Sequence, residues 1–294
     1  MVKRVLTLQD LGPEGAWLLM QQANGIPDAL EKSSFMAGRT ALLLFKEESL
    51  ADRLCVTAAV RQMGGQVVYV GAGDWVQDLS RCPVEISPIY DYYVDCTYVL
   101  GIDAASTQRS EKYLTRIPTL NLGNAEACPA RVLADLACML RFTHGDLSKA
   151  QVAWLGAPNG VLYSLLEAAA YFPFSLRIAL PRKAAINHYM IEQVRKSGAK
   201  VELVETKEAA LKHCNFMCIG DNGGVCNTED WNVDGALLEH APDAYMLLCS
   251  QTMRNSLPVQ PEILEGPRTL LLLQAENRLR VHKRLLHWVL GEEA

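Results

Sequence analysis

The sequence contains no long hydrophobic run. No apolar stretch approaches the ~20 residues that a membrane-spanning helix requires. The first residues, Met1 to Thr7, lead into polar Gln9 and Asp10 too early to hold the hydrophobic core of a secretion signal. We therefore expect a cytoplasmic protein that does not bind membranes.

An excess of positive charge is also missing. The 28 lysine and arginine residues are outnumbered by 33 acidic residues, which gives a net charge of -5. This balance provides no electrostatic attraction for nucleic acid or for an anionic membrane surface. The length of 294 residues, 50% of them hydrophobic, allows two domains with well-buried cores.

The nine cysteines form no recognisable framework. Their number is odd and no CxxC pair occurs, which argues against paired disulfides and against a structural zinc site. Cys214, Cys218 and Cys226 lie close together in the sequence, but the first two flank apolar Phe216 and Met217. Cysteine in such a setting is usually a small buried hydrophobe, so we expect no metal.

What the sequence does contain is an alternation of strand and helix patterns. Residues 40–45 form a short apolar run that is typical of a strand buried on both faces. Residues 50–64 follow with helical spacing, in which Leu54 is one of the apolar positions, and residues 66–70 form a second strand. A strand, helix and strand in this order predict a parallel sheet with a right-handed crossover.

The alternation continues to the end of the chain. It predicts further strands at 98–101, 117–121, 151–156, 176–180, 201–204, 215–219 and 245–249, and further helices at 129–141, 161–171, 186–196 and 275–290. The turn at Thr143 to Asp146 is the best boundary. The sequence therefore predicts an α/β fold of two open parallel-sheet domains, residues 1–143 and 144–294.

Ligands of such sheets bind beyond the carboxyl ends of the strands. The loop after the strand at 40–45 continues as Ser49-Leu50-Ala51-Asp52-Arg53, and the last helix opens with Gln274-Ala275-Glu276-Asn277-Arg278. Together with Leu133-Ala134-Asp135-Leu136, these segments resemble the ornithine and aspartate carbamoyltransferases, and the ornithine branch more closely. Their order and spacing extend the resemblance over nearly the whole chain.

The resemblance implies an N-terminal domain for carbamoyl phosphate and a C-terminal domain for the amino acid. It also implies that the helix at 275–290 packs on the N-terminal domain, that no cofactor is needed, and that the chain assembles as a homotrimer. The partners would be a small anion, an amino acid or both. On the anion side, the resemblance assigns Ser49, Arg53, Cys128, Arg131 and Arg278.

The sequence departs from the family at this anion site. The family loop reads Ser-Thr-Arg-Thr-Arg, whereas here only Ser49 and Arg53 are kept and Asp52 brings a negative charge. We expect each lost or repelled charged contact to weaken anion binding by about 1 to 3 kcal/mol. Leu100 stands where the family has an arginine, and Cys128-Pro-Ala-Arg131 replaces a His-Pro-x-Gln segment that polarises the carbamoyl carbonyl.

On the amino-acid side, the resemblance assigns Asn159, Asp221 and Cys249. Asn159 lies in a glycine and asparagine turn, although a neighbouring asparagine of the family is Gly160 here. Asp221 matches a family aspartate without the Ser-Met-Gly that follows it. Cys249 matches the cysteine of the family's His-Cys-Leu-Pro loop, whose other three residues differ in this chain.

Each of these residues also has a purely structural interpretation. Ser49 can cap the helix that starts at Leu50. Asp52 and Arg53 can be exposed helix positions and Arg131 a solvated side chain. Arg278 can have a structural role in a basic helix face with Arg280, Lys283 and Arg284. Cys128 as a nucleophile would need an activating base, and no histidine is adjacent in sequence. We assign none of the six histidines to catalysis.

Three functions are therefore open. The first is a family member with its ancestral carbamoyl phosphate site largely lost, serving as a binding, regulatory or structural homologue. The second is an active transferase with a changed donor or amino-acid acceptor, in which positioning and charge stabilisation carry the reaction. The third is ordinary ornithine carbamoyl transfer by compensating residues. We rank them in this order.

Overall fold

The computed structural model describes residues 3–25, 32–71, 92–102, 117–220, 231–249 and 259–291. The chain divides into two compact units. Unit 1 comprises Met1–Ala134 and Ala275–Ala294, and unit 2 comprises Asp135–Gln274. The final helix of the chain therefore contributes to unit 1, together with the N-terminal residues.

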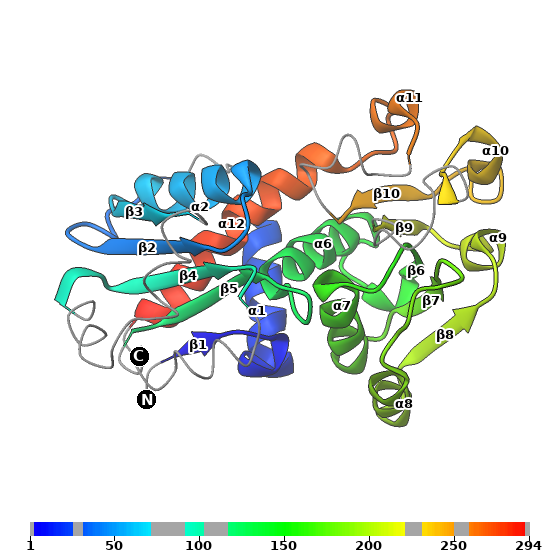
Figure 1. Ribbon diagram of the computed structural model, residues 1–294, viewed down its shortest axis with the longest axis horizontal. Helices are drawn as coiled ribbons and strands as arrows, with labels where there is room; N and C mark the ends of the chain where they lie inside the picture. Colours follow the sequence, from blue (N-terminus) through cyan, green and yellow to red (C-terminus); the bar gives the residue numbers. More distant parts are fainter. Residues whose placement is uncertain are drawn as a thin grey trace. The chain divides into compact units, whose positions relative to one another are not determined.

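The described part of unit 1 is built on a parallel sheet (Figure 1). Its strands are β1 (Arg4–Val5), β2 (Thr40–Phe45), β3 (Gln66–Val70), β4 (Cys96–Leu100) and β5 (Thr119–Gly123), in the order β1-β5-β4-β2-β3. The predicted strands at 40–45 and 66–70 are confirmed with the same bounds. The strand predicted from Ile117 begins two residues later because Pro118 has no N–H to donate to a neighbouring strand.

The helices of unit 1 are α1 (Gly12–Gly25), α2 (Leu50–Gln62), the first part of α6 (Pro129–Phe142) and most of α12 (Leu271–Leu290), with a short 3-10 turn at Leu8–Asp10. The stripe predicted for α2, with Leu54, Ala58, Val60 and Met63 at helical spacing, is buried at Val60 and Met63 and exposed at Leu54. Val56, Ala59 and Val60 are buried, whereas Leu54 is 60% exposed. The expected burial of Leu54 is therefore wrong, because the helix faces the sheet with the stripe that begins at Asp52.

The basic residues of α12 are not an exposed face. Arg278, Arg280 and Lys283 are 4%, 3% and 6% exposed. Arg280 donates hydrogen bonds to Glu276 and Asn277, so its charge is matched on the same helix. The basic face of this helix is therefore buried at these three residues, and each buried charge needs a partner inside the unit.

Unit 2 contains a second parallel sheet. Its described strands are β6 (Gln151–Leu155), β7 (Ser175–Ala179), β8 (Lys200–Val204), β9 (Phe216–Ile219) and β10 (Tyr245–Leu248), in the order β10-β9-β6-β7-β8. The helices are α7 (Gly160–Tyr171), α8 (His188–Lys196), α9 (Lys207–Leu211), α10 (Gly235–Leu238) and α11 (Pro261–Leu264), with a 3-10 turn at Leu147–Lys149. The predicted α/β fold with two parallel sheets is confirmed.

Helices cover both faces of this second sheet. Figure 1 shows α7 and α8 on one side of the sheet, and α9 and α10 on the other. The core on the α9 and α10 side is formed by alternate strand residues such as Ala153 and Leu155 of β6 with Met217 and Ile219 of β9. Burial on both faces explains why these strands read as continuous apolar runs.

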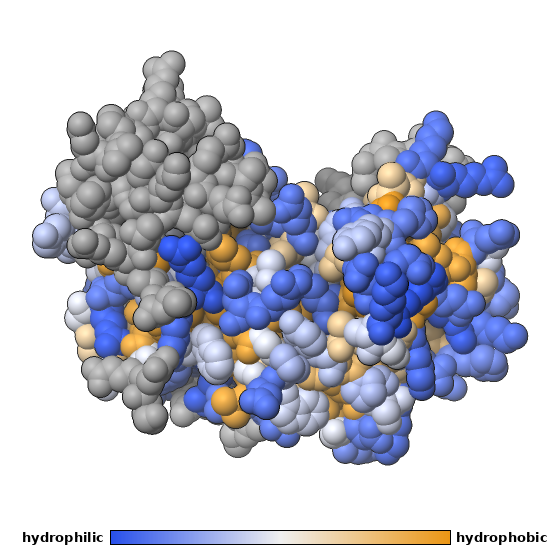
Figure 2. All heavy atoms as spheres, turned by 90° about the horizontal axis from the view of Figure 1, so that it is seen from below, coloured by the Kyte–Doolittle hydropathy of each residue, from blue (hydrophilic) through white to orange (hydrophobic). Residues whose placement is uncertain are grey.

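The surface shows the mixture that is ordinary for a globular protein. Figure 2 shows hydrophilic residues over most of the visible surface that is not grey, with hydrophobic residues in small groups between them. None of the helices in the described ranges combines the length and the hydrophobicity that crossing a membrane requires.

Candidate functional site

The sheet of unit 1 has a topological switch between β2 and β4. From β2 the chain moves outward to β3 and then returns to the other side of β2 to form β4. The carboxyl ends of the two strands are neighbours, and the N–H of Lys46 after β2 donates to the carbonyl of Leu100 at the end of β4. Ligands of open α/β sheets bind at such a point, so the loop from Lys46 to Ser49 is where a site is expected.

Ser49 caps the helix that leaves this loop. Its backbone is extended, with φ -141° and ψ 99°, and its hydroxyl oxygen accepts a hydrogen bond from the N–H of Asp52 at 3.3 Å. The hydroxyl also donates to Oδ2 of Asp52 at 2.5 Å. The capping role predicted for Ser49 is confirmed, and its side chain is engaged with Asp52.

Asp52 is the centre of the site. The sequence interpretation as an exposed helix position is wrong, because the residue is 4% exposed. Its Oδ1 accepts a hydrogen bond from Nη2 of Arg278, and Nη2 of Arg131 lies 3.4 Å from Oδ1 and 3.5 Å from Oδ2. The structure thus brings together Ser49, Arg131 and Arg278 around one buried carboxylate.

Burial and the charged partners of Asp52 shift its pKa in opposite directions. Removal from water acts to raise the pKa of the carboxyl, because it disfavours the charged form. The charges of Arg278 and Arg131 and the hydrogen bond from Ser49 outweigh burial and hold the pKa below its ordinary value. The carboxylate therefore stays charged at neutral pH and is a permanent partner for both guanidinium groups.

The two arginines are held firmly. The Arg131 side chain is 13% exposed and the Arg278 side chain 5% exposed, so the solvated interpretation of Arg131 is wrong. Arg131 enters from the first turn of α6, which follows β5, whereas Arg278 comes from α12 at the other end of the sequence. Three separate helices therefore meet at Asp52.

Arg53 lies apart from this cluster. Its guanidinium carbon is 4.7 Å from the ring centroid of Tyr69 on β3, a cation–π arrangement. The hydroxyl of Tyr69 donates to Glu48 at 3.0 Å, so a carboxylate lies close to the same ring. The described contacts of Arg53 thus involve Tyr69 rather than Asp52, although the sequence placed it with Ser49 in the anion site.

Cys128 has the setting of a structural cysteine. It is 3% exposed, and its thiol donates to the carbonyl oxygen of Leu122 at 3.0 Å. Within the described ranges there is no group of three or more His, Cys, Asp and Glu side chains placed to hold a metal ion. Cys214 and Cys218 are described, and Cys226 lies outside the described residues.

Sequence reasoning missed His282, which lies beside the cluster. His282 is 1% exposed, and its ring packs edge-on against that of Tyr98, with the centroids 5.6 Å apart. Burial and the charge of Arg278 lower the pKa of His282 to about 3, so the imidazole is neutral at pH 7. A usable signal existed, because Arg278 and His282 are four residues apart and share one helix face.

Unit 2 has its own switch point, between β6 and β9. Asn159 follows β6 as the N-cap of α7, and its Oδ1 accepts hydrogen bonds from the N–H groups of Val161 at 3.0 Å and Leu162 at 3.2 Å. Cys249 follows β10 at the same edge of the sheet, where its N–H donates to the carbonyl of Ile219. Asp221, the third residue assigned to this side, lies outside the described residues.

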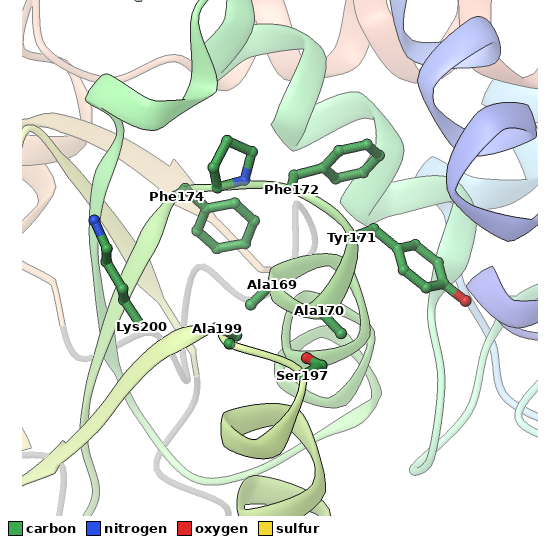
Figure 3. Close-up of a pocket in the computed structure, with 10 residues that line it drawn as sticks. Ala169, Ala170, Tyr171, Phe172, Phe174, Ser197, Ala199 and Lys200 are labelled. Atoms are coloured by element: carbon green, nitrogen blue, oxygen red, sulfur yellow. The ribbon is translucent and has the colours of Figure 1, made fainter.

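A surface pocket of unit 2 lies at the opposite edge of its sheet. It has a volume of about 250 Å³ and is lined by the end of α7, by the loop at 172–174 and by Ser197 to Lys200. Figure 3 shows Tyr171, Phe172 and Phe174 around it, with Lys200 as its charged residue. These residues precede β7 and β8, whereas ligands of such sheets bind beyond the carboxyl ends of strands. The pocket is therefore not the candidate site.

The two halves of the chain match two parts of one known family. Residues 3–141 match the carbamoyl-P binding domain of the aspartate/ornithine carbamoyltransferases. Residues 148–289 match the Asp/Orn binding domain of the same enzymes. The chain belongs to the aspartate/ornithine carbamoyltransferase family.

Individual relatives agree with this assignment. The chain is 29% identical over 303 residues to an ornithine carbamoyltransferase of Nitratidesulfovibrio vulgaris, covering 99% of this chain and 100% of that protein. It is 27% identical over 301 residues to that of Oleidesulfovibrio alaskensis, covering 99% of both.

Solved structures share the fold. The ornithine carbamoyltransferase from Thermus thermophilus superposes with a TM-score of 0.86 at 23% identity, covering 99% of this chain and 100% of that chain. The anabolic enzyme from Campylobacter jejuni gives the same TM-score at 24% identity and the same coverage. At this identity the likeness supports the fold, and the function of the site must be argued from its own residues.

Proposed function

We propose that this member of the carbamoyltransferase family has largely lost the ancestral carbamoyl phosphate site and does not carry out ordinary carbamoyl transfer. It would act as a binding, regulatory or structural homologue of ornithine carbamoyltransferase. The observation that supports this is the buried carboxylate of Asp52, which is paired with Arg278 and Arg131 at the switch point of unit 1.

A bound phosphate and the Asp52 carboxylate would compete for the same two guanidinium groups. A phosphate dianion needs several converging donors and positive charge. Here both guanidinium groups and the Ser49 hydroxyl already serve Asp52. An incoming phosphate would have to separate the buried Asp52–Arg278 pair, at a cost of about 3 to 5 kcal/mol. That cost corresponds to a loss of affinity on the order of 10²- to 10⁴-fold.

Two further positions support the same proposal. Leu100, where the family has an arginine, is 8% exposed at the end of β4 and supplies no charge. Cys128 directs its thiol to the carbonyl of Leu122 and replaces a histidine that would polarise the carbamoyl carbonyl. The donors that would stabilise the developing charge of the reaction are therefore reduced as well as the phosphate contacts.

A direct test uses the purified wild-type protein. Calorimetry with carbamoyl phosphate should show no micromolar binding, and incubation with carbamoyl phosphate plus ornithine or aspartate should yield no citrulline or carbamoyl-aspartate above the uncatalysed rate. Turnover at ordinary enzyme rates would remove the proposal.

One observation favours a second candidate, an active transferase with a changed donor or acceptor. The site holds two arginines against one aspartate, since Arg131 has joined Arg278. The remaining single positive charge suits a singly charged acyl donor better than a phosphate dianion. Thermal-shift screening against acyl phosphates, carboxylates and amino acids identifies the compounds that bind. Turnover of any of these compounds separates this candidate from the first, which predicts binding without turnover.

Other features of the relatives are carried over as proposals. We propose that Asn159, Asp221 and Cys249 mark an amino-acid side in unit 2, that the functional halves divide at residues 143 and 144, and that the chain forms a homotrimer. Sedimentation equilibrium of the purified chain tests the last of these, and a monomer would contradict it.

A further inference from the structure

The surroundings of the Asp52 carboxylate have the composition of an oxyanion site. The cluster contains the hydroxyl of Ser49, the guanidinium groups of Arg131 and Arg278, and the N-terminus of the thirteen-residue helix α2. Helix N-termini and arginine forks are the two commonest protein devices for holding phosphate and carboxylate groups. The donors come from α2, α6 and α12, so their convergence does not depend on one loop.

In the wild-type chain the anion at this place belongs to the chain itself. Oδ1 of Asp52 faces the two arginines, and Oδ2 accepts from Ser49. The carboxylate side chain is 5% exposed, so solvent anions do not compete with it freely. It is bound to the backbone three residues after the helix cap, which gives it a high effective concentration at the site.

The Asp52 carboxylate does not use every donor of Arg278. Nε of Arg278 is buried and has no hydrogen-bond partner among the described residues, while Nη2 of the same guanidinium binds Asp52. These two nitrogens lie on the edge that binds oxyanions with two parallel hydrogen bonds. The carboxylate of Asp52 therefore uses this edge incompletely, and a larger or freely oriented oxyanion could use both nitrogens.

We propose that Asp52 is a tethered anion occupying a competent oxyanion-binding site, and that removing this one carboxylate lets the site bind a free oxyanion such as phosphate or formate. The inference rests on the proposed function, since it explains why the wild-type site rejects phosphate. It goes further in stating that the donors still present at this site, those of Ser49, Arg131 and Arg278, would hold a free oxyanion once the Asp52 carboxylate is removed.

The charges of the cluster decide the direction of the effect. Removing the carboxylate leaves two buried guanidinium groups, which repel one another and have lost their shared partner. A free oxyanion that binds there reduces the repulsion and gives both guanidinium groups a partner again. We therefore expect phosphate to bind an Asp52→Ala variant about 100-fold more tightly than it binds the wild type.

The experiment compares four proteins in buffers of equal ionic strength. Wild type, D52A, D52N and the double variant D52A/R278M are titrated with inorganic phosphate by calorimetry, and their melting temperatures are followed with phosphate and with formate. We expect a concentration-dependent stabilisation of D52A by both anions and of D52N by at least one of them. Wild type should show none, and D52A/R278M should lose it because one half of the fork is gone.

The controls separate a specific site from a general salt effect. R195Q in the D52A background should leave phosphate binding unchanged, because Arg195 pairs with Glu192 at an exposed position of α8 in unit 2. If D52A is unfolded in plain buffer, recovery of its folded circular dichroism on adding formate or phosphate supports the inference, and failure of both anions to restore it counts against it.

The possible failures are distinguishable. A folded D52A that binds no phosphate overturns the inference and leaves the proposed function standing. Wild type that binds phosphate or carbamoyl phosphate as tightly as D52A overturns both, because Asp52 would then exclude nothing. Equal stabilisation of D52A and D52A/R278M also overturns the inference, since the anion would not be held by the arginine fork.

Discussion

The carboxylate of Asp52 is paired with the guanidinium of Arg278, 226 residues further along the chain. The contact joins the first turn of α2 to the last helix of the chain within unit 1. It consequently has two roles. It fixes α12 against the N-terminal part of the unit, and it decides which anion the switch point holds.

The first prediction concerns the structural role of this pair. Replacing Arg278 by methionine leaves Asp52 buried with Arg131 and Ser49 as its remaining partners. Because loss of one member of a buried pair costs about 3 to 5 kcal/mol, we expect the free energy of unfolding to fall by about 3 kcal/mol, at the lower end of that range. Urea denaturation followed by circular dichroism measures it.

An exposed ion pair of unit 2 provides the matched control. Lys149 lies 3.4 Å from Asp146, with side chains 65% and 44% exposed. Pairs of this kind contribute about 0 to 1 kcal/mol, so K149M should change stability by less than R278M does. Equal losses of unfolding free energy in the two variants would show that the buried pair stabilises the protein no more than the exposed pair does.

The positions of β2 and β3 along the chain could be predicted because they depend on local sequence. The runs at 40–45 and 66–70 are apolar, short and bounded by turn residues, and they form β2 and β3 with unchanged bounds. The capping role of Ser49 is local as well, since it involves the N–H of Asp52 three residues later.

The state of the charged residues could not be predicted in the same way. Asp52 is buried because α6 and α12 deliver arginines to it, and nothing near Asp52 in the sequence reports residues 79 and 226 positions away. An exposed position therefore remained open for Asp52 and a solvated one for Arg131. The helical spacing of His282 from Arg278 can be read from the sequence, but its burial cannot.

A second prediction follows from the pKa of His282, which is about 3 in the folded protein against an ordinary value of 6.5 for histidine. Between these values the unfolded chain binds a proton and the folded protein does not, so acid favours unfolding. The stability is complete above pH 6.5 and falls as the pH drops. The loss grows by about 1.4 kcal/mol per pH unit and reaches about 5 kcal/mol near pH 3.

The variant H282Q isolates this contribution. The charged groups around His282 are Arg278, Asp52 and Arg131. The lowered pKa of Asp52 stabilises the folded protein too, but this stabilisation begins to fall only below the ordinary aspartate pKa of 3.8. Urea denaturation at pH 7 and pH 4.5 should therefore show a smaller acid loss for H282Q than for wild type. H188Q, at an exposed position of α8, is the control, and an unchanged slope in H282Q would contradict the assignment.

A third prediction concerns the thiols. Burial raises the pKa of Cys55 to about 11 and that of Cys214 to about 12. At pH 8 the thiolate fraction of Cys55 is then about one in a thousand. Iodoacetamide followed by peptide mass spectrometry should leave Cys55, Cys214 and the buried Cys128 unmodified in the folded protein, and should modify all three in urea. Rapid alkylation of Cys128 in the folded state would revive the idea of a reactive nucleophile there.

The last prediction separates the two roles of Asn159, the cap of α7 and the proposed contact to an amino acid. Its Oδ1 accepts hydrogen bonds from two backbone N–H groups at the start of α7, and loss of such a cap costs about 0.5 to 2 kcal/mol. Asn159→Ala should therefore destabilise the protein by about 1 kcal/mol, whereas Asn159→Asp keeps the accepting oxygen and should be close to neutral. Thermal shifts with ornithine and other amino acids then give the second readout. If Asn159 only caps the helix, the aspartate variant retains any amino-acid response of the wild type; if its amide nitrogen contacts the ligand, that response is lost while stability is kept.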